Sequence, residues 1–152
     1  MLTTHTFKLL KNSTCPIINI PNLMGINALI DTGASIPVWT ADASILTRIM
    51  RAKLCLKDTY ITGFGGRCYG DVYKIDFNLG GISFPDMPIF TARIGGNNKQ
   101  MILSASMFTG LQYIIDDANK EFKIVNLDSK DRISCTVPMR NLFNFPHFYN
   151  FP

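Results

Sequence analysis

The residues of this chain best suited to acid–base chemistry are Asp31-Thr32-Gly33, which directly follow the apolar run Ala28-Leu29-Ile30. An apolar strand that ends on an aspartate places the carboxylate on rigid backbone, and the glycine lets neighbouring backbone approach it closely. A carboxylate that acts as a general acid or base needs this fixed position and a partly dehydrated setting. The sequence therefore predicts a catalytic Asp31, against the simpler interpretation of an ordinary turn at a strand end.

Other residue types that carry chemistry give weaker signals. Only His5 and His147 are present for a Ser or Cys triad, and both lie in terminal segments. The glycine run at 63–66 lacks the Lys-Ser/Thr of a phosphate loop. No Cys-x-x-Cys spacing occurs, which argues against a zinc site and a redox pair. We expect no metal and no cofactor, and reduced, mostly buried thiols at Cys15, Cys55, Cys68 and Cys135.

Composition narrows the class of protein further. Hydrophobic residues make up 47% of the 152 residues and charged residues 17%, which predicts one folded domain and excludes disordered, collagen-like and coiled-coil chains. The longest apolar stretch, Ile17 to Ile30, is broken by Pro and Asn and is too short for a membrane helix. The net charge of +4 is spread along the chain, which argues against a nucleic-acid partner. The N-terminus does not resemble a secretory signal, so we expect a cytoplasmic protein.

Period-2 alternation is the main structural signal. In Tyr73–Leu79 apolar residues hold the odd positions and polar residues the even ones, which predicts a half-buried strand. Helical spacing occurs only in 41–51 and, briefly, in 105–110. The sequence thus predicts an all-β fold with one or two short helices. Further strands are expected at 7–10, 17–20, 26–30, 60–62, 82–84, 89–94, 113–115 and 122–125.

Three stretches, in order, resemble one known family. The run Leu29-Ile30-Asp31-Thr32-Gly33-Ala34-Ser35 resembles the active-site signature of aspartic proteases of the pepsin and retropepsin type. Residues 60–67, Tyr-Ile-Thr-Gly-Phe-Gly-Gly-Arg, resemble the glycine-rich flap hairpin of retroviral proteases, and residues 101–108 lie where that family has two apolar residues, a Gly and a short helix. The resemblance covers about residues 7–125. It implies a small closed β-barrel of the retropepsin type.

The resemblance also implies roles for individual residues. Pepsin-like enzymes carry two Asp-Thr/Ser-Gly motifs and this chain carries one, so Asp31 is expected to find its partner carboxylate on a second copy, in a C2 homodimer. Thr32 is expected to hydrogen-bond across the dimer axis and, with Gly33, to form the active-site loop. Contacts to an extended peptide substrate are expected from Ala34, Ser35, Ile61, Gly63, Phe64 and Gly65.

The chain departs from the viral pattern behind the active site. Ser104 stands where the family usually has Gly, and Ala105 stands where retroviral enzymes carry Arg. The Asp that usually pairs with this Arg is replaced by Ser35, so both halves of the ion pair are missing together and no buried charge is left unpaired. This resembles cellular and bacterial members more than viral ones. We also expect the Ser104 hydroxyl to cap the short helix that follows.

Residues 126–152 differ in character from residues 1–125, which we expect to form the protease-like domain. This extension carries Pro138, Pro146 and Pro152 and an aromatic run at 143–151. We favour a role in the dimer interface, because burial of Phe and Tyr could replace a missing ion pair. A segment that folds over the cleft as a built-in inhibitor and a partner-docking peptide remain as alternatives.

The sequence supports three functional hypotheses. The first is a homodimeric aspartic endopeptidase that acts on extended proteins or peptides, with no nucleic-acid partner and no stable membrane insertion. The second is a catalytically weak or inactive dimer of the same fold that binds extended peptides. The third is a different small β-barrel with a fortuitous Asp-Thr-Gly, used as a nucleic-acid or structural module.

Overall fold

A computed structural model describes residues 3–20, 23, 25–41, 43–63, 65–93, 100–126 and 148–149. Two short helices occur in this part of the chain, α1 (Ala43–Ile49) and the 3-10 helix η1 (Ala105–Phe108). The predicted β-rich fold with short helices is confirmed. The strands are β1 (Thr3–Lys8), β2 (Ile17–Asn19), β3 (Asn27–Asp31), β4 (Val38–Trp39), β5 (Lys53–Gly63), β6 (Gly66–Leu79), β7 (Ile82–Ala92), β8 (Gln100–Ser104), β9 (Gln112–Asp116), β10 (Glu121–Asn126) and β11 (Phe148–Tyr149).

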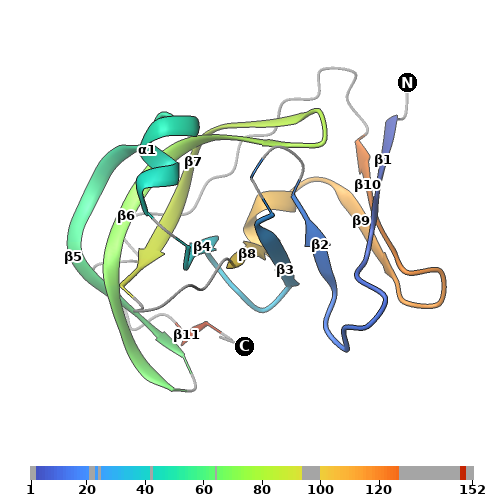
Figure 1. The fold of residues 1–152 in the computed structure, drawn as a ribbon, viewed down its shortest axis with the longest axis horizontal. Coiled ribbons are helices and arrows are strands. Elements are labelled where there is room, and N and C mark those ends of the chain that lie inside the picture. Colours follow the sequence, from blue (N-terminus) through green and yellow to red (C-terminus); the bar gives the residue numbers. More distant parts are fainter. Residues whose placement is uncertain are drawn as a thin grey trace.

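The strands form two sheets rather than the expected closed barrel. The smaller sheet has the order β1-β10-β9, and the larger has the order β11-β5-β6-β7-β4-β8-β3-β2. Closure would need the first and last strands of a sheet to pair, but within the described residues β2 meets the smaller sheet only through the Leu9–Ile18 bridge. The described residues therefore form no closed barrel, contrary to the prediction. Figure 1 shows the smaller sheet at the right and the curved β5–β6–β7 part of the larger one at the left.

One crossing in the larger sheet positions the Asp31 loop. β8 lies between β3 and β4, parallel to β3 and antiparallel to β4. Since β3 and β4 are consecutive in the chain, the loop 32–37 that joins them must pass over the end of β8. The register places Asp31 beside Ser104. The predicted acid therefore lies at the end of a strand that has neighbours on both sides.

Long strands β5 and β6 form a hairpin that extends past the rest of the sheet (Figure 1). Sequence analysis recognised only 60–62 of β5, because residues 53–59 include Lys53, Lys57 and Asp58 and are mostly exposed. The two strands expected at 82–84 and 89–94 are one strand, β7. Two prolines, Pro85 and Pro88, are tolerated in β7 because β4 pairs with β7 only at Phe90 and Thr91. Between them, Asp86 takes a φ of +51° where the pairing of β7 with β6 is irregular.

Buried side chains form two clusters. The main core lies between the smaller sheet, α1, η1 and most of the larger sheet, and it holds large side chains such as Trp39, Phe84, Phe108 and Phe122. The second cluster, which we call the site core, contains Ala34, Ile36, Val38, Ile61, Val72, Phe90, Ala92 and Ile102. It joins the segment after Asp31 to the β5–β6 hairpin.

Helices in the described part of the chain are too short to cross a membrane, and none combines the length and apolar character that a span needs. Of the expected extension at 126–152, the structure describes only residue 126 and β11. Phe148 and Tyr149 of β11 pair in parallel with Thr62 and Gly63 of β5. The domain boundary at 125/126 stays a prediction.

Candidate active site

Asp31 is held at the end of β3 by local hydrogen bonds. The Gly33 N–H donates to Asp31 Oδ1 at 2.9 Å, and the Ala34 N–H donates to the Asp31 carbonyl oxygen at 3.2 Å. This is the turn that Asp readily forms with backbone two residues on. Asp31 is half-buried, while Thr32, Gly33 and Ser35 are exposed. The carboxylate is thus fixed on ordered backbone beside a loop that faces outward.

Ser104 fits behind this loop. It is 0% exposed, and β3 and β8 keep a regular register from Asn27–Gln100 to Asp31–Ser104. Its hydroxyl is paired with the Ser106 hydroxyl at 2.6 Å, which satisfies the buried oxygen. The expected capping of η1 by Ser104 was wrong, because the side chain makes no capping bond and turns to Ser106 instead.

Two of the predicted substrate-binding residues are buried together. Ala34 is 3% exposed and Ile61 is 1% exposed, and both belong to the site core. Ile61 alternates along β5 with the half-buried Tyr60 and Thr62, so its side chain points inward toward the segment after Asp31. The structure therefore brings the Asp31 loop and the hairpin together through apolar packing.

The tip of the hairpin contains the predicted flap glycines. Gly63 is half-buried and Gly65 is exposed, whereas Phe64 lies outside the described residues. Behind the tip, the rings of Tyr60 and Tyr69 lie 5.9 Å apart and the Arg67 guanidinium lies 4.4 Å from the Tyr60 ring centroid. This cross-strand stack stiffens the hairpin just behind its glycine-rich turn.

Sequence analysis missed the residues that support this site from beneath. Ile36, Val38 and Ile102 are buried in the site core, and the Phe90 N–H donates to the Pro37 carbonyl at 2.9 Å, which ties the loop to β7. The period-2 spacing of Ala34, Ile36 and Val38 is a signal that could have revealed them. Their side chains pack in one cluster with Ile61 and Val72 of the hairpin.

Side chains that could serve a metal or redox site are scattered. In the described ranges no group of three or more His, Cys, Asp or Glu side chains is suited to hold a metal ion. Cys15 and Cys55 are exposed and Cys68 is half-buried, all three as free thiols, so the expectation of mostly buried thiols was wrong for these positions. Burial raises the pKa of the Cys68 thiol. Cys135 lies outside the described residues.

Comparisons with known proteins assign no family to this chain. No family model matches this sequence, and no curated protein matches it either. Among solved structures, a retropepsin-like aspartic protease from Rickettsia conorii aligns with a TM-score of 0.48 and 15% identity, covering 82% of this chain and 92% of that one. We therefore base the functional proposal on the residues of this chain alone.

Proposed function

We propose that this chain is one subunit of a homodimeric aspartic endopeptidase, of the retropepsin type that residues 29–35 resemble. The observation that carries the proposal is the Asp31 carboxylate, oriented by the Gly33 N–H at the end of a buried strand and flanked by an exposed Thr32-Gly33. One carboxylate is half of the required pair, so a second copy must bring its own Asp31. The exposed loop is where that copy would meet it.

The proposed chemistry needs only two carboxylates and water. When two carboxyl groups lie a few ångströms apart, like-charge repulsion disfavours the state in which both are ionised, so the reactive pair holds one proton. The ionised carboxylate accepts a proton from a water bound between them as that water attacks the scissile carbonyl carbon, and the other carboxylic acid donates its proton to the carbonyl oxygen. Collapse of the tetrahedral intermediate then transfers a proton to the leaving amine and releases the two peptide fragments.

Peptide recognition would use backbone pairing. The outer edge of β5 at Thr62 and Gly63 carries the added strand β11 in this structure, which supports an ability of the hairpin to accept extended chain. Ser35 and the glycines of the hairpin tip would offer further backbone groups, and residues 63–66 would cover the peptide. The cytoplasmic location and the absence of a nucleic-acid partner stay predictions.

The decisive test pairs sedimentation with cleavage of a denatured protein mixture between pH 4 and 7.5. Asp31→Asn should lower cleavage by about 100-fold or more, because it removes the acid–base pair, and should leave the dimer intact. Asp117→Asn is the matched control, since Asp117 lies in an exposed turn. A wild-type monomer without cleavage at any pH would contradict the proposal.

A peptide-binding dimer without turnover is the second candidate, and the β11 pairing on the hairpin edge is the observation that favours it. It predicts a wild-type dimer that binds extended peptides and cleaves none of them. In that case Asp31→Asn would leave the affinity unchanged, whereas substitutions in the hairpin would weaken it.

A further inference from the structure

The β5–β6 hairpin loses its support from β7 at one place. Gly70 is the first residue of β6 in the pairing with β7, opposite Ala92, and among the described strands residues 66–69 pair with β5 alone. The last backbone link is the Arg93 N–H, which donates to the Tyr69 carbonyl at 3.0 Å. Beyond this root, the described contacts of the hairpin are the β11 pairing at Thr62 and Gly63 and the packing of Ile61 in the site core (Figure 1). Contacts at the root therefore contribute, together with these, to the direction of the tip.

β5 is kinked at the same place. Leu56 pairs with Val72 and Thr59 pairs with Gly70, so Lys57 and Asp58 together stand against the single residue Asp71. Such a bulge bends a strand and increases its twist. Asp58 has a φ of +55°, a left-handed conformation that Asp tolerates better than most residues.

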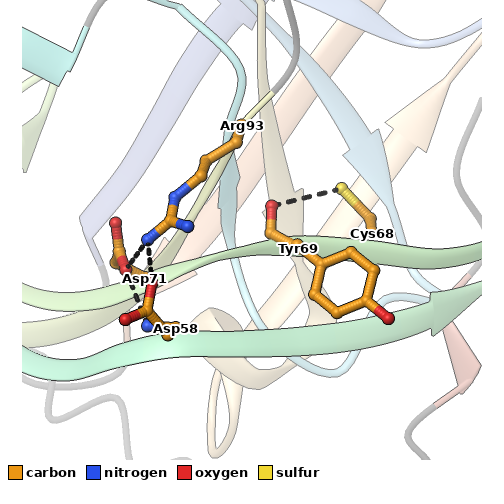
Figure 2. Close-up of polar contacts among 5 residues, drawn as sticks. All are labelled: Asp58, Cys68, Tyr69, Asp71 and Arg93. Carbon is orange, nitrogen blue, oxygen red and sulfur yellow. Dashed lines mark hydrogen bonds and ion pairs between the residues drawn. The ribbon is translucent and has the colours of Figure 1, made fainter.

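Three charged side chains meet across this bulge. Arg93 Nη2 lies 2.6 Å from Oδ1 of Asp58 and 2.6 Å from Oδ1 of Asp71, and the Asp58 N–H donates to Asp71 Oδ1 at 2.9 Å. Figure 2 shows the Arg93 side chain directed toward both carboxylates. Tyr69, from which β6 continues into the hairpin, is drawn beside them. The contacts join the bulge of β5, the adjacent residue of β6 and the residue that follows β7.

The backbone beneath these side chains is tightly packed. A Cβ added at Gly70 would collide with the Thr91 carbonyl oxygen and would lie 2.8 Å from the Phe90 ring. β6 and β7 are therefore in close contact at the root, and the absence of a side chain at position 70 permits it. On the other side of Gly70, the bulge of β5 is held by the charged contacts.

Electrostatics makes these contacts depend on the arginine. The hydrogen bond from Arg93 lowers the pKa of Asp58, with Lys57 as a further positive charge nearby. Without the guanidinium, the two carboxylates would face each other across the bulge and repel. Because Asp58 is 65% and Arg93 50% exposed, the ion pairs contribute little to global stability. Even a small interaction energy at the root of the hairpin changes the population of conformations in which the hairpin has moved away from the Asp31 loop.

We propose that Arg93, Asp58 and Asp71 form a clamp that sets the direction of the β5–β6 hairpin, so that these three are positioning residues for the cover over the Asp31 site. The covering role rests on the proposed function, whereas the clamp itself is a property of the fold. Asp71, with a side chain only 17% exposed, anchors the clamp, and Arg93 closes it over the bulge.

The first test measures amide hydrogen exchange along the hairpin, which requires no catalysis. Arg93→Met keeps the length of the side chain and removes the charge, and Arg93→Lys keeps one charged nitrogen that can lie between the two carboxylates. We expect exchange at residues 60–69 to accelerate about fivefold in Arg93→Met and to stay within about twofold of wild type in Arg93→Lys. Amides of β10 should be unchanged in both variants.

Three results would overturn the clamp: hairpin exchange in Arg93→Met that equals wild type, equal acceleration in β10, or an Arg93→Lys variant as fast as Arg93→Met. If the wild type cleaves peptides, Arg93→Met should also raise KM about threefold with a smaller change in kcat, because the hairpin binds rather than reacts. If the wild type cleaves nothing, the proposed enzyme fails while the exchange data still decide the clamp.

Acid should loosen the clamp in the wild type. A carboxylate with a lowered pKa contributes stability above its ordinary titration range and loses it as the pH falls through the lowered value. We therefore expect hairpin exchange, corrected for its intrinsic pH dependence, to accelerate below about pH 4 in the wild type. Arg93→Met has no ion pair to lose, so an equal acceleration in that variant would contradict the assignment.

Discussion

The main core and the site core are built from different side chains and hold different parts of the molecule. The main core packs large rings against one another: Phe108 lies 5.6 Å from Phe122 and 6.4 Å from Phe84, measured between ring centroids. The site core consists mostly of aliphatic side chains, with Phe90 as its one aromatic ring. It joins the segment after Asp31 to the hairpin. We therefore expect substitutions in the main core to act chiefly on global stability and substitutions in the site core to act chiefly on the Asp31 loop and the hairpin.

The sharpest way to break the main core is Phe84→Ala. Phe84 is fully buried between the Phe77 and Phe108 rings, so its truncation leaves a large cavity. We expect the free energy of unfolding to fall by about 3–5 kcal/mol, measured by urea denaturation. Tyr69→Ala, at an exposed aromatic of the hairpin, is the control and should change it by less than about 1 kcal/mol. A loss for Phe84→Ala no larger than that of the control would contradict this description of the core.

Ile61→Ala tests the site core. We expect a loss of about 2–3 kcal/mol, since the removed atoms leave a smaller cavity at a site that can partly collapse. Hydrogen exchange should accelerate first in the hairpin and in residues 32–37, because Ile61 links these two segments. Thr62→Ala is the neighbouring control. Uniform acceleration across β9 and β10 would show that the two clusters are one cooperative unit.

Thr91→Val should change the stability least, and it tests the region where the two clusters meet. Thr91 pairs with Trp39 of the main core and with Asp71 of the clamp, and its buried hydroxyl has no hydrogen-bond partner among the described residues. Replacing an unsatisfied buried hydroxyl by a methyl group should stabilise the fold by about 1 kcal/mol, seen as a higher Tm. Thr109→Val should not stabilise, because the Thr109 hydroxyl donates to the Ser106 carbonyl. A lower Tm for Thr91→Val would mean that its hydroxyl is satisfied in solution.

The sequence predicted the strands whose side chains alternate between core and solvent. Tyr73–Leu79 lies within β6, and its odd positions Ile75, Phe77 and Leu79 are buried. The first half of β5 was missed because its charged side chains face solvent and its backbone is ordered only by pairing with β6. β4 was missed because two residues carry no periodic signal. A closed barrel was predicted from the resemblance, and the described residues do not form one. The local sequence pattern does not determine whether strands distant in the sequence pair at the edges of a sheet.

The candidate site likewise has one part that the sequence predicts and one part that it does not. Asp31 and its glycine could be found from a local motif, since the strand, the acid and the turn are contiguous. The clamp could not, because Asp58, Asp71 and Arg93 come from three strands or strand ends and meet only through the register of β5, β6 and β7. Sequence analysis assigned no role to Asp58. Its backbone conformation shows it to be part of a bulge.

The position of β8 between β3 and β4 has a consequence for how the protein is made. Asp31 leaves the ribosome long before Ser104, yet the strand that must lie beside Asp31 is β8. Contacts so distant in sequence form late and slowly during folding. A nascent chain therefore carries the acid without the support that fixes it, and the Asp31 loop becomes ordered only when almost the whole domain has been synthesised. Order of synthesis thus delays any activity of Asp31 until the fold is nearly complete.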